Sequence, residues 1–149
     1  MADRVEGGCR CGAVRYRLAV TAMPKAYACH CLDCQTWSGS AFAQQLLVAE
    51  NVIETSGPVV EYSFTSPSVS TSRQRICGTC HTRIYNTNDA RPGAAVVRAG
   101  TLDNSDTLET PLHIWIKRKQ PWLRLPHDAV TFDEYGSLEA LTTLFARKN

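Results

Sequence analysis

Apolar and polar residues alternate along three segments of the chain: residues 13–20, 59–64 and 112–117. Successive side chains of an extended chain point to opposite faces, so a period of two is typical of a β-strand with one apolar face. In the first segment Val14, Tyr16 and Leu18 share one face, and Arg15 and Arg17 occupy the other. Each segment is therefore predicted to be a strand. The apolar faces of the other two are Val60, Tyr62 and Phe64, and Leu112, Ile114 and Ile116.

Less regular apolar runs predict three more strands, at residues 41–48, 83–86 and 94–99. Turns that contain proline or glycine separate the strands. The Ser/Thr-rich residues 63–72 predict either a mobile loop or an edge strand with polar faces. Only the C-terminus has helical spacing, because Leu138, Leu141 and Phe145 recur on one face and Ser137 suits the N-cap. The pattern predicts a mainly β protein with a short C-terminal helix.

The length, charge and hydropathy of the chain exclude several classes of protein. A chain of 149 residues supplies one sizeable core, so we expect a single domain over residues 1–149. The formal net charge of +2 is weaker than the basic footprint of a dedicated nucleic-acid binder. No apolar run approaches the ~20 residues of a membrane-spanning helix, and the first residues lack a signal segment. We expect a cytoplasmic protein without nucleic-acid or membrane partners.

Seven cysteines are the unusual feature of the composition. Their number is odd, and structural disulfides are rare in a reducing compartment. Inert buried thiols would explain one or two of them, but not their clustering. Thiols at spacings of two and three residues in such a chain are most often metal ligands. The clusters are Cys9 with Cys11, Cys29 with Cys31 and Cys34, and Cys77 with Cys80.

The spacing of the cysteines favours two metal sites of different kinds. Residues two apart on a strand point the same way, so Cys9 and Cys11 can face one ion. A closed structural zinc site has four protein ligands, whereas a site with three keeps one position for water or substrate. Joining the first and last clusters into a four-cysteine site leaves a local three-cysteine site and uses every cysteine. We favour this pairing.

A second pairing of the clusters is open on spacing alone. The C-x-x-C pairs at residues 31–34 and 77–80 can also make a four-cysteine site, but Cys29 then has no role. A four-iron cluster is disfavoured because its typical C-x-x-C-x-x-C run is absent. A thioredoxin-like redox use needs a βαβ context, which this strand-rich pattern lacks. We expect zinc, with two ions per chain.

Several stretches of the sequence, taken in order, resemble one known family. The main ones are GGCRCGAVRY at residues 7–16, CHCLDC at 29–34, WSGSAF at 37–42 and CGTC at 77–80. Shorter matches follow at residues 100–103, 113–115 and 121–122. From Gly7 to about Pro126 the chain resembles the glutathione-dependent formaldehyde-activating family, which includes centromere protein V-like domains. It differs from that family's usual pattern at Arg10, His81 and Arg83, where members often have His, Gly and Pro.

The resemblance implies a fold, two metal sites and an activity. The fold is one of packed, tent-like antiparallel sheets with a zinc at their join. The implied enzyme is a carbon–sulfur lyase similar to S-hydroxymethylglutathione synthase, which adds a thiol such as glutathione to an aldehyde such as formaldehyde, or catalyses the reverse. The alternative is a non-catalytic, zinc-stabilised module that carries a thiol or binds a protein. Matched residue by residue, the structural zinc ligands are Cys9, Cys11, Cys77 and Cys80, and the catalytic zinc ligands are Cys29, Cys31 and Cys34.

Glutathione carries two carboxylates and one ammonium group, so cations are expected around the bound thiol. The basic run of Lys117, Arg118 and Lys119 is one candidate, although such runs are more often solvated faces. Trp37 is another, because it follows the three-cysteine segment by three positions on a Ser/Gly-rich loop. The four histidines are expected to be ordinary core or surface residues, and strand alternation points His30 away from the metal.

Overall fold

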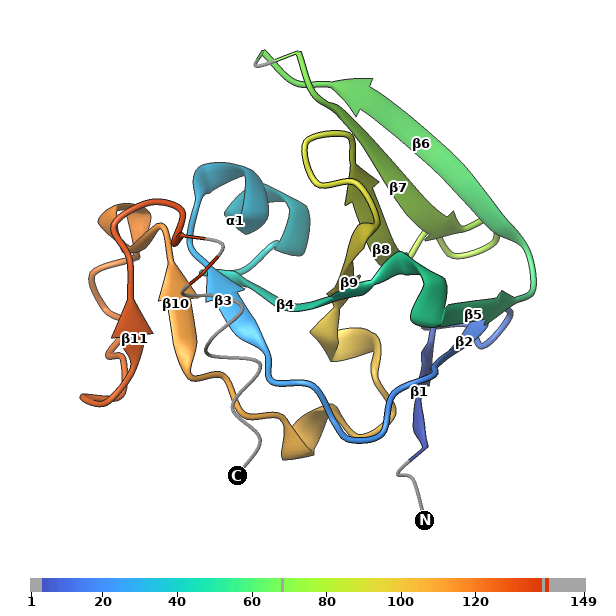
Figure 1. Cartoon of the computed structure of the whole chain (residues 1–149), viewed down its shortest axis with the longest axis horizontal. Coiled ribbons are helices and arrows are strands. Elements are labelled where there is room, and N and C mark those ends of the chain that lie inside the picture. Colours follow the sequence, from blue (N-terminus) through green and yellow to red (C-terminus); the bar gives the residue numbers. More distant parts are fainter. Residues whose placement is uncertain (1–3, 68, 138, 140–149) are drawn as a thin grey trace. The chain divides into compact units, whose positions relative to one another are not determined.

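The structure is a computed structural model that describes residues 4–67, 69–137 and 139. The protein is mainly β, as predicted, and its chain forms two compact units (Figure 1). The first unit contains the described parts of Met1–Met23 and Leu46–Leu108; the second contains those of Pro24–Gln45 and Glu109–Asn149. The single domain over residues 1–149 stays a prediction.

Three antiparallel strands of the first unit form a small sheet in the order β1-β2-β5. The strands are β1 (Val5–Gly8), β2 (Arg15–Leu18) and β5 (Ile53–Ser56). The predicted apolar face is confirmed, since Val14, Tyr16 and Leu18 are all buried. Arg15 and Arg17 lie on the opposite face, where they form ion pairs with Asp103 and Glu54.

Two glycines lead from this sheet into the first cysteine cluster. A Cβ at Gly7 would lie 2.4 Å from the carbonyl oxygen of Thr101, and one at Gly8 would lie 2.6 Å from that of Val14. The hydroxyl of Tyr16 also packs against Gly7 and is hydrogen-bonded to Oγ1 of Thr101 at 2.8 Å. Side chains do not fit at these two positions, which explains the Gly-Gly pair before the first cysteine.

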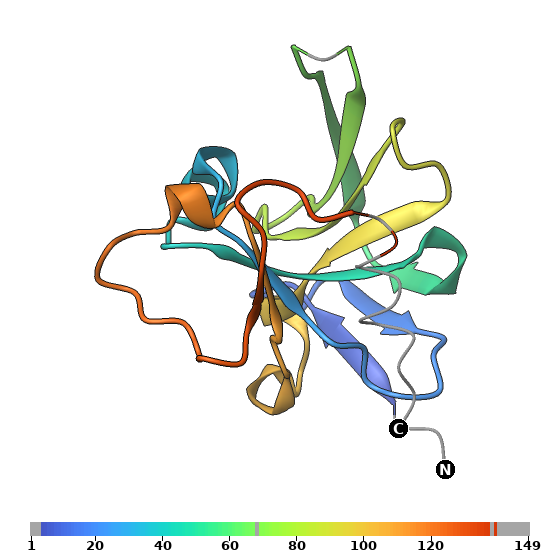
Figure 2. The same ribbon diagram turned by 60° about the vertical axis from the view of Figure 1, so that its left-hand side comes forward.

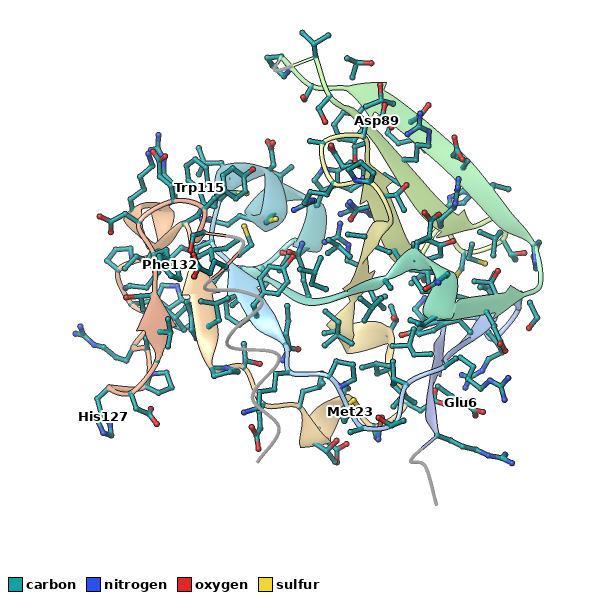
Figure 3. All side chains as sticks on the ribbon, viewed as in Figure 1. Glu6, Met23, Asp89, Trp115, His127 and Phe132 are labelled. Atoms are coloured by element: carbon teal, nitrogen blue, oxygen red, sulfur yellow. The ribbon has the colours of Figure 1, made fainter. Side chains whose placement is uncertain are left out.

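Four further strands of the first unit are antiparallel neighbours in the order β9-β8-β7-β6 (Figure 1). They are β6 (Val59–Thr65), β7 (Thr71–Cys77), β8 (Arg83–Asn88) and β9 (Ala94–Arg98). The register of β7 against β8 shifts between Arg75 and Ile76. Asp89 lies just beyond the end of β8 (Figure 3) and forms an ion pair with Arg73. The fully buried residues of these strands include Ile84, Ala95 and Val97.

The second unit is built on strands in the order β11-β10-β3-β4 (Figure 1), and Figure 2 shows the same ribbon from another direction. These are β3 (Tyr27–Cys29), β4 (Ala43–Ala49), β10 (Leu112–Ile114) and β11 (Val130–Thr131); the chain passes into the first unit within β4. Strand β3 is antiparallel to β4 but parallel to β10, and β10 is parallel to β11. Two pairings of this unit thus depart from the antiparallel arrangement that the family resemblance implies.

Helix α1 (Leu32–Ser38) follows β3 and is absent from the sequence prediction. None of its seven residues is buried, so it has no apolar stripe for a periodicity analysis to detect. Its ends are capped instead: the sulfur of Cys31 accepts the N–H of Cys34, and Gly39 ends the helix at φ 62°. Capping, and not burial, therefore defines this helix.

Other predicted elements differ in extent or surroundings. The predicted strand at residues 112–117 ends at Ile114, because Trp115 is left-handed at φ 59° and Ile116–Arg118 forms a 3₁₀ turn. The predicted C-terminal helix falls almost wholly on residues 138 and 140–149, outside the described residues. Three more 3₁₀ turns lie in the first unit, at Glu50–Val52, Ala99–Thr101 and Ser105–Thr107.

The segment at residues 63–72 is divided between β6, a connecting turn and β7, so its first part is the edge strand of the two alternatives predicted. The alternation along β6 is correct as well, but the face that carries Val60, Tyr62 and Phe64 is exposed.

Candidate metal centres

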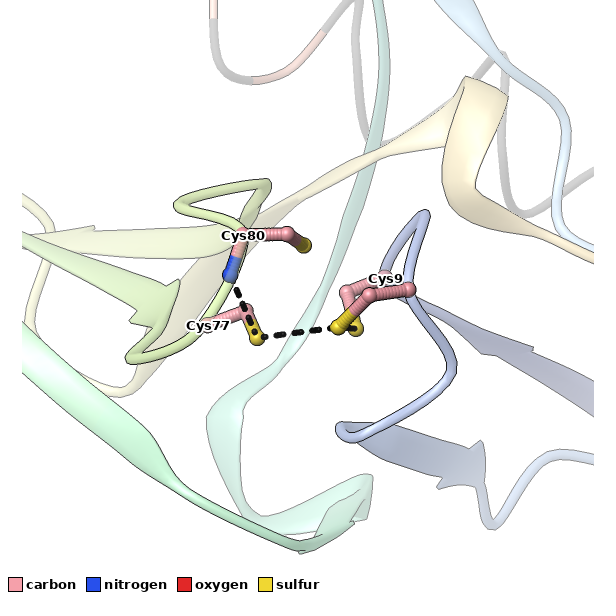
Figure 4. Close-up of side chains that lie close together, drawn as sticks. Cys9, Cys77 and Cys80 are labelled. Atoms are coloured by element: carbon pink, nitrogen blue, oxygen red, sulfur yellow. Dashed lines mark hydrogen bonds between the residues drawn. The ribbon is translucent and has the colours of Figure 1, made fainter.

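Four cysteines of the first unit bring their thiols together. The sulfur atoms of Cys9, Cys11, Cys77 and Cys80 all lie within 4.8 Å of one another. The Sγ atoms of Cys9 and Cys11 are 3.5 Å apart, and those of Cys11 and Cys77 are 3.9 Å apart. Figure 4 shows the side chains of Cys9, Cys77 and Cys80 converging from two separate turns. The structure therefore selects the pairing of the first and last cysteine clusters.

This cluster fits zinc by the spacing of its sulfurs. A tetrahedral site with Zn–S bonds of about 2.3 Å places its four sulfurs about 3.8 Å apart. The sulfur–sulfur distances of 3.5 and 3.9 Å lie on either side of that value. Thiolates at this separation repel one another without a cation between them. The four residues can thus hold one ion in a closed site.

Two turns present these thiols, the second of which begins where β7 ends at Cys77. Cys9 and Cys11 lie just after β1, in a turn closed by the N–H of Gly12 donating to the carbonyl of Cys9. The strand geometry expected for this pair is wrong, although the convergence of its thiols is correct. In the second turn the N–H groups of Thr79 and Cys80 point at Sγ of Cys77, at 3.4 and 3.5 Å.

Hydrogen bonds favour the thiolate form of one cysteine in each turn. The N–H of Val14 donates to Sγ of Cys9 at 3.2 Å and lowers the pKa of that cysteine. The hydroxyl and the N–H of Thr82 lower the pKa of Cys80 to about 5. Because a thiolate is the form that binds metal, these donors prepare the cluster for an ion.

Three cysteines of the second unit form a separate cluster. The sulfurs of Cys29, Cys31 and Cys34 lie within 4.8 Å of one another. Cys29 ends β3 and is buried, Cys31 is the N-cap of α1, and Cys34 lies in the first turn of that helix. The passage from strand to capped helix turns three nearby residues toward one point. Nε2 of the buried Gln45 also donates to Sγ of Cys34 at 3.7 Å.

The three thiols share protons unequally. Cys31 accepts hydrogen bonds from Cys29 and Cys34, which lowers its pKa to about 2. The same contacts with Cys31 and Cys34, together with burial, raise the pKa of Cys29. These contacts favour the thiolate form of Cys31, the helix N-cap. Three thiolates satisfy three positions of a tetrahedral ion and leave the fourth for an exogenous ligand.

His30 lies between two of these cysteines in sequence but is not part of their cluster. Its ring is fully buried, and its Nε2 is 2.9 Å from Nδ1 of His113, which is also buried. Burial, with a smaller contribution from His113, lowers the pKa of His30 to about 4; burial lowers that of His113 too. Both rings are therefore neutral near pH 7, and they join β3 to β10 in the core. The expectation of a core role agrees with this geometry.

Comparison with known proteins shows the family of this chain. The family model described as glutathione-dependent formaldehyde-activating enzyme matches residues 4–118 and so includes all seven cysteines. The chain belongs to this glutathione-dependent formaldehyde-activating family. A search of curated proteins gives no significant match.

A crystal structure of a Rhodobacter sphaeroides protein shares the fold. Its TM-score is 0.52 at 19% sequence identity, over 66% of this chain and 87% of that one. No helix in the described part of this family member is long and apolar enough to cross a membrane.

The predicted substrate-binding residues lie in the second unit of this formaldehyde-activating family member. Trp37 is on α1 and 39% exposed. Lys117 forms an ion pair with Glu134 and lies 4.8 Å from the ring centroid of Trp115. Lys119 donates to two backbone carbonyls, so its ammonium group is already engaged. Arg118 is exposed, which makes it the cation of the run most accessible to an anionic ligand.

Sequence reasoning missed Gln35, Gln120 and Trp122, which line a groove of about 590 Å³ beside α1. Nε2 of Gln35 donates to the carbonyls of His30 and Arg118, at 2.8 and 2.9 Å. Nε2 of Gln120 donates to Oε1 of Gln35, and the indole N–H of Trp122 donates to Oε1 of Gln120. This chain of amides fixes an exposed tryptophan next to the helix that carries Cys34. Glutamines so far apart in sequence have no pattern that predicts the contact.

Proposed function

We propose that this protein is a zinc-dependent enzyme of the carbon–sulfur lyase type that adds a thiol, such as glutathione, to an aldehyde such as formaldehyde, or catalyses the reverse. One observation carries the proposal: the three-thiol cluster of Cys29, Cys31 and Cys34 stands apart from a four-thiol cluster able to form a closed site. A closed site of four thiols suffices for a structural ion, whereas a set of three thiols leaves one position for an exogenous ligand. Family membership supports the same reaction.

In the addition, a bond forms between the thiol sulfur and the carbonyl carbon while the C=O π pair moves to oxygen, and the proton of the thiol ends on that oxygen. Cys29, Cys31 and Cys34 would hold a zinc ion, and such an ion would lower the pKa of an incoming thiol and so supply the nucleophilic thiolate. The N-cap position of Cys31 and the Gln45 amide at Cys34 fix two of the three protein sulfurs. His30 and His113 stay neutral and hold the strand that carries Cys29.

The groove beside α1 suits the peptide part of a thiol such as glutathione. Its volume of about 590 Å³ falls in the usual range for small-molecule sites. Trp122 offers an exposed aromatic wall, and Gln120 keeps hydrogen-bonding capacity for a peptide amide. Arg118 provides an exposed positive charge for a carboxylate. One functional domain over residues 1–149 and a reducing, cytoplasmic location belong to the same proposal, since cysteines that bind zinc must remain reduced.

The proposal is tested by exchange NMR spectroscopy of glutathione and formaldehyde, because their adduct also forms without a catalyst. We expect the zinc-loaded protein to accelerate exchange between free and adduct glutathione, and Cys34→Ser to abolish the acceleration and retain about one zinc. Asp33→Asn, which changes the neighbouring exposed residue and no ligand, is the matched control. Glutathione binding without faster exchange would support the non-catalytic thiol carrier instead. Normal exchange in Cys34→Ser would refute the assignment of this cluster.

A further inference from the structure

Strand β6 carries an apolar stripe at the edge of its sheet. Val60, Tyr62 and Phe64 alternate along it and are 48%, 52% and 36% exposed. The rings of Tyr62 and Phe64 are in contact, with centroids 6.0 Å apart. Among the described strands, β6 is paired with β7 alone (Figure 1). A long apolar edge strand is a template for pairing with another chain, and proteins usually protect such edges with charges or proline.

The backbone hydrogen bonds of β7 show which way its residues face. The N–H of Cys77 donates to the carbonyl of Thr82, and the carbonyl of Cys77 accepts from His81, so both groups point away from β6. At the other end of β7, the carbonyl of Thr71 accepts from the N–H of Asp89, beyond β8. The two groups of one residue point the same way in an antiparallel ladder, and this direction alternates along the strand. Odd-numbered residues of β7 therefore bond away from β6, and even-numbered ones bond to it.

The register of the hairpin carries this alternation over to β6. Even-numbered residues are paired with even-numbered ones, as in Val60 with Ile76 and Tyr62 with Gln74. The even-numbered residues of β6 thus use their backbone groups to bond to β7. The odd-numbered residues, Glu61 and Ser63 among them, direct their N–H and C=O groups outward from the sheet. The stripe and the outward backbone groups therefore occupy different residues.

We propose that β6 pairs antiparallel with β6 of a second copy of this chain, about a twofold axis at Tyr62. Glu61 of each copy then lies opposite Ser63 of the other, and their outward backbone groups exchange four hydrogen bonds. Tyr62 lies opposite Tyr62, and Val60 lies opposite Phe64. The exposed stripe thus becomes a continuous apolar ladder across two strands, the arrangement that stabilises cross-strand pairs.

Other positions of the axis match the strand less well. An axis at Glu61 sets this carboxylate against its own copy, and like charges directly opposite are destabilising. An axis at Ser63 places Val60 opposite the polar Ser66. Only the axis at Tyr62 pairs every member of the stripe with another member of the stripe.

On the face of the two paired β6 strands opposite the apolar stripe, the charges of the two copies are complementary. Glu61 forms an ion pair with Arg75 on the neighbouring strand of its own copy. In the proposed register, four residues lie in one row across the strands. They are Arg75 and Glu61 of one copy, followed by Ser63 and Arg73 of the second copy. Each Glu61 therefore lies between an arginine of its own chain and one of the other. No row brings two acidic residues together.

Pairing through one strand makes a small interface, of the size found in reversible complexes. We therefore expect a monomer–dimer equilibrium that depends on protein concentration, measurable by sedimentation equilibrium of the zinc-loaded chain. Tyr62→Lys places two ammonium groups opposite each other and is expected to raise the dimer dissociation constant about tenfold or more. Tyr62→Phe keeps the ring and is expected to leave the equilibrium unchanged. Zinc content and circular dichroism confirm that both variants are folded.

Disulfide trapping tests the register directly. Residues in a non-hydrogen-bonded antiparallel pair have Cα atoms about 4.5 Å apart, within disulfide reach, so Tyr62→Cys is expected to give covalent dimers under mild oxidation. Ser63→Cys is the matched control, because its two copies are offset to roughly 8 Å and are expected not to cross-link. The unmodified chain reports any cross-linking through its own cysteines. Monomers at every concentration, a dimer insensitive to Tyr62→Lys, or cross-linking of Ser63→Cys equal to that of Tyr62→Cys would each overturn the proposal.

Discussion

Replacing one cysteine from each cluster should separate stability from function. Cys77 is fully buried, and its sulfur lies 3.9 Å from that of Cys11, 66 residues earlier in the chain. Cys77→Ser removes a ligand that joins two distant turns. Cys31→Ser removes a ligand from a cluster whose members lie within six consecutive residues. We expect the first variant to lose stability and the second to lose thiol binding or turnover.

The expected difference in stability between the two variants follows from the length of the loop that each ion would close. Closing a loop costs chain entropy that grows as (3/2)RT ln n, so loops of 66 and 5 residues differ by about 2 kcal/mol. For a chain of this length that corresponds to a melting temperature lower by about 4–8 °C for Cys77→Ser than for Cys31→Ser. Serine is also a good N-cap, so Cys31→Ser keeps the start of α1 while it removes the metal ligand. Cys31→Ala removes both and is expected to be about 1 kcal/mol less stable than Cys31→Ser.

The assay combines a thermal melt, a zinc measurement and a glutathione titration of each variant. We expect Cys31→Ser to melt close to the unmodified chain, keep about one zinc and fail to bind glutathione. Cys77→Ser should melt earlier or be poorly soluble, with function lost as a consequence. A stable Cys77→Ser beside an unfolded Cys31→Ser would refute the assignment of the two clusters. Normal thiol binding by both variants would show that the three-cysteine cluster is not part of the functional site.

Mild chelation should remove about one zinc equivalent while the fold persists, because four thiolates retain an ion better than three thiolates and a water; loss of all metal together with unfolding would contradict two classes of site. His81→Gly should raise the free energy of unfolding by about 0.5–1 kcal/mol, because His81 is held at φ 62° where only glycine is unstrained; chemical denaturation of the zinc-loaded protein measures this, and destabilisation would contradict it. Arg118→Gln should weaken glutathione binding more at low than at high salt, and a salt-independent titration would return Arg118 to an ordinary surface role. The pKa of His30 falls from about 6.5 in the unfolded chain to about 4 in the fold, so its contribution to stability is complete above pH 6.5 and is lost as the pH falls toward 4. His113→Gln should reduce the acid sensitivity at equal zinc content, and an unchanged pH profile of unfolding would refute this.

The cysteine clusters were predictable because short-range spacing and ligand number determine them. The three-cysteine cluster lies within one segment, so its convergence needs no knowledge of the fold. The four-cysteine cluster joins distant turns, and only the requirement to use every cysteine favoured its pairing. The expected strand geometry at Cys9 and Cys11 was wrong because β1 ends at Gly8 and Cys9 begins a turn, which the N–H of Gly12, at φ 82°, closes. The thiols converge as expected although the local backbone is different.

Burial and long-range polar contacts were not predictable in the same way. The alternation of Val60, Tyr62 and Phe64 identifies a strand, but their exposure depends on the edge position of β6, which no local pattern encodes. Helix α1 lacks a buried face, so only its caps mark it in the sequence. The amide contact between Gln35 and Gln120 spans 85 residues and depends wholly on how the chain folds. The local chemistry could therefore be predicted from the sequence, whereas the tertiary positions of these residues could not.

The members of the two clusters are separated by different lengths of chain, so the two clusters are completed at different times during synthesis on the ribosome. All three ligands of the second-unit cluster have been made once Cys34 is added, whereas the four-thiol cluster must wait for Cys80. At typical translation speeds of about 5–20 residues per second, that delay is roughly 2–9 seconds. During this interval the nascent chain carries Cys9 and Cys11 without their partners, exposed to cellular oxidants and competing metals. Synthesis of the turn that carries Cys77 and Cys80 therefore ends the interval in which Cys9 and Cys11 lack partners. The three-cysteine cluster has no comparable interval, because its members lie within six consecutive residues.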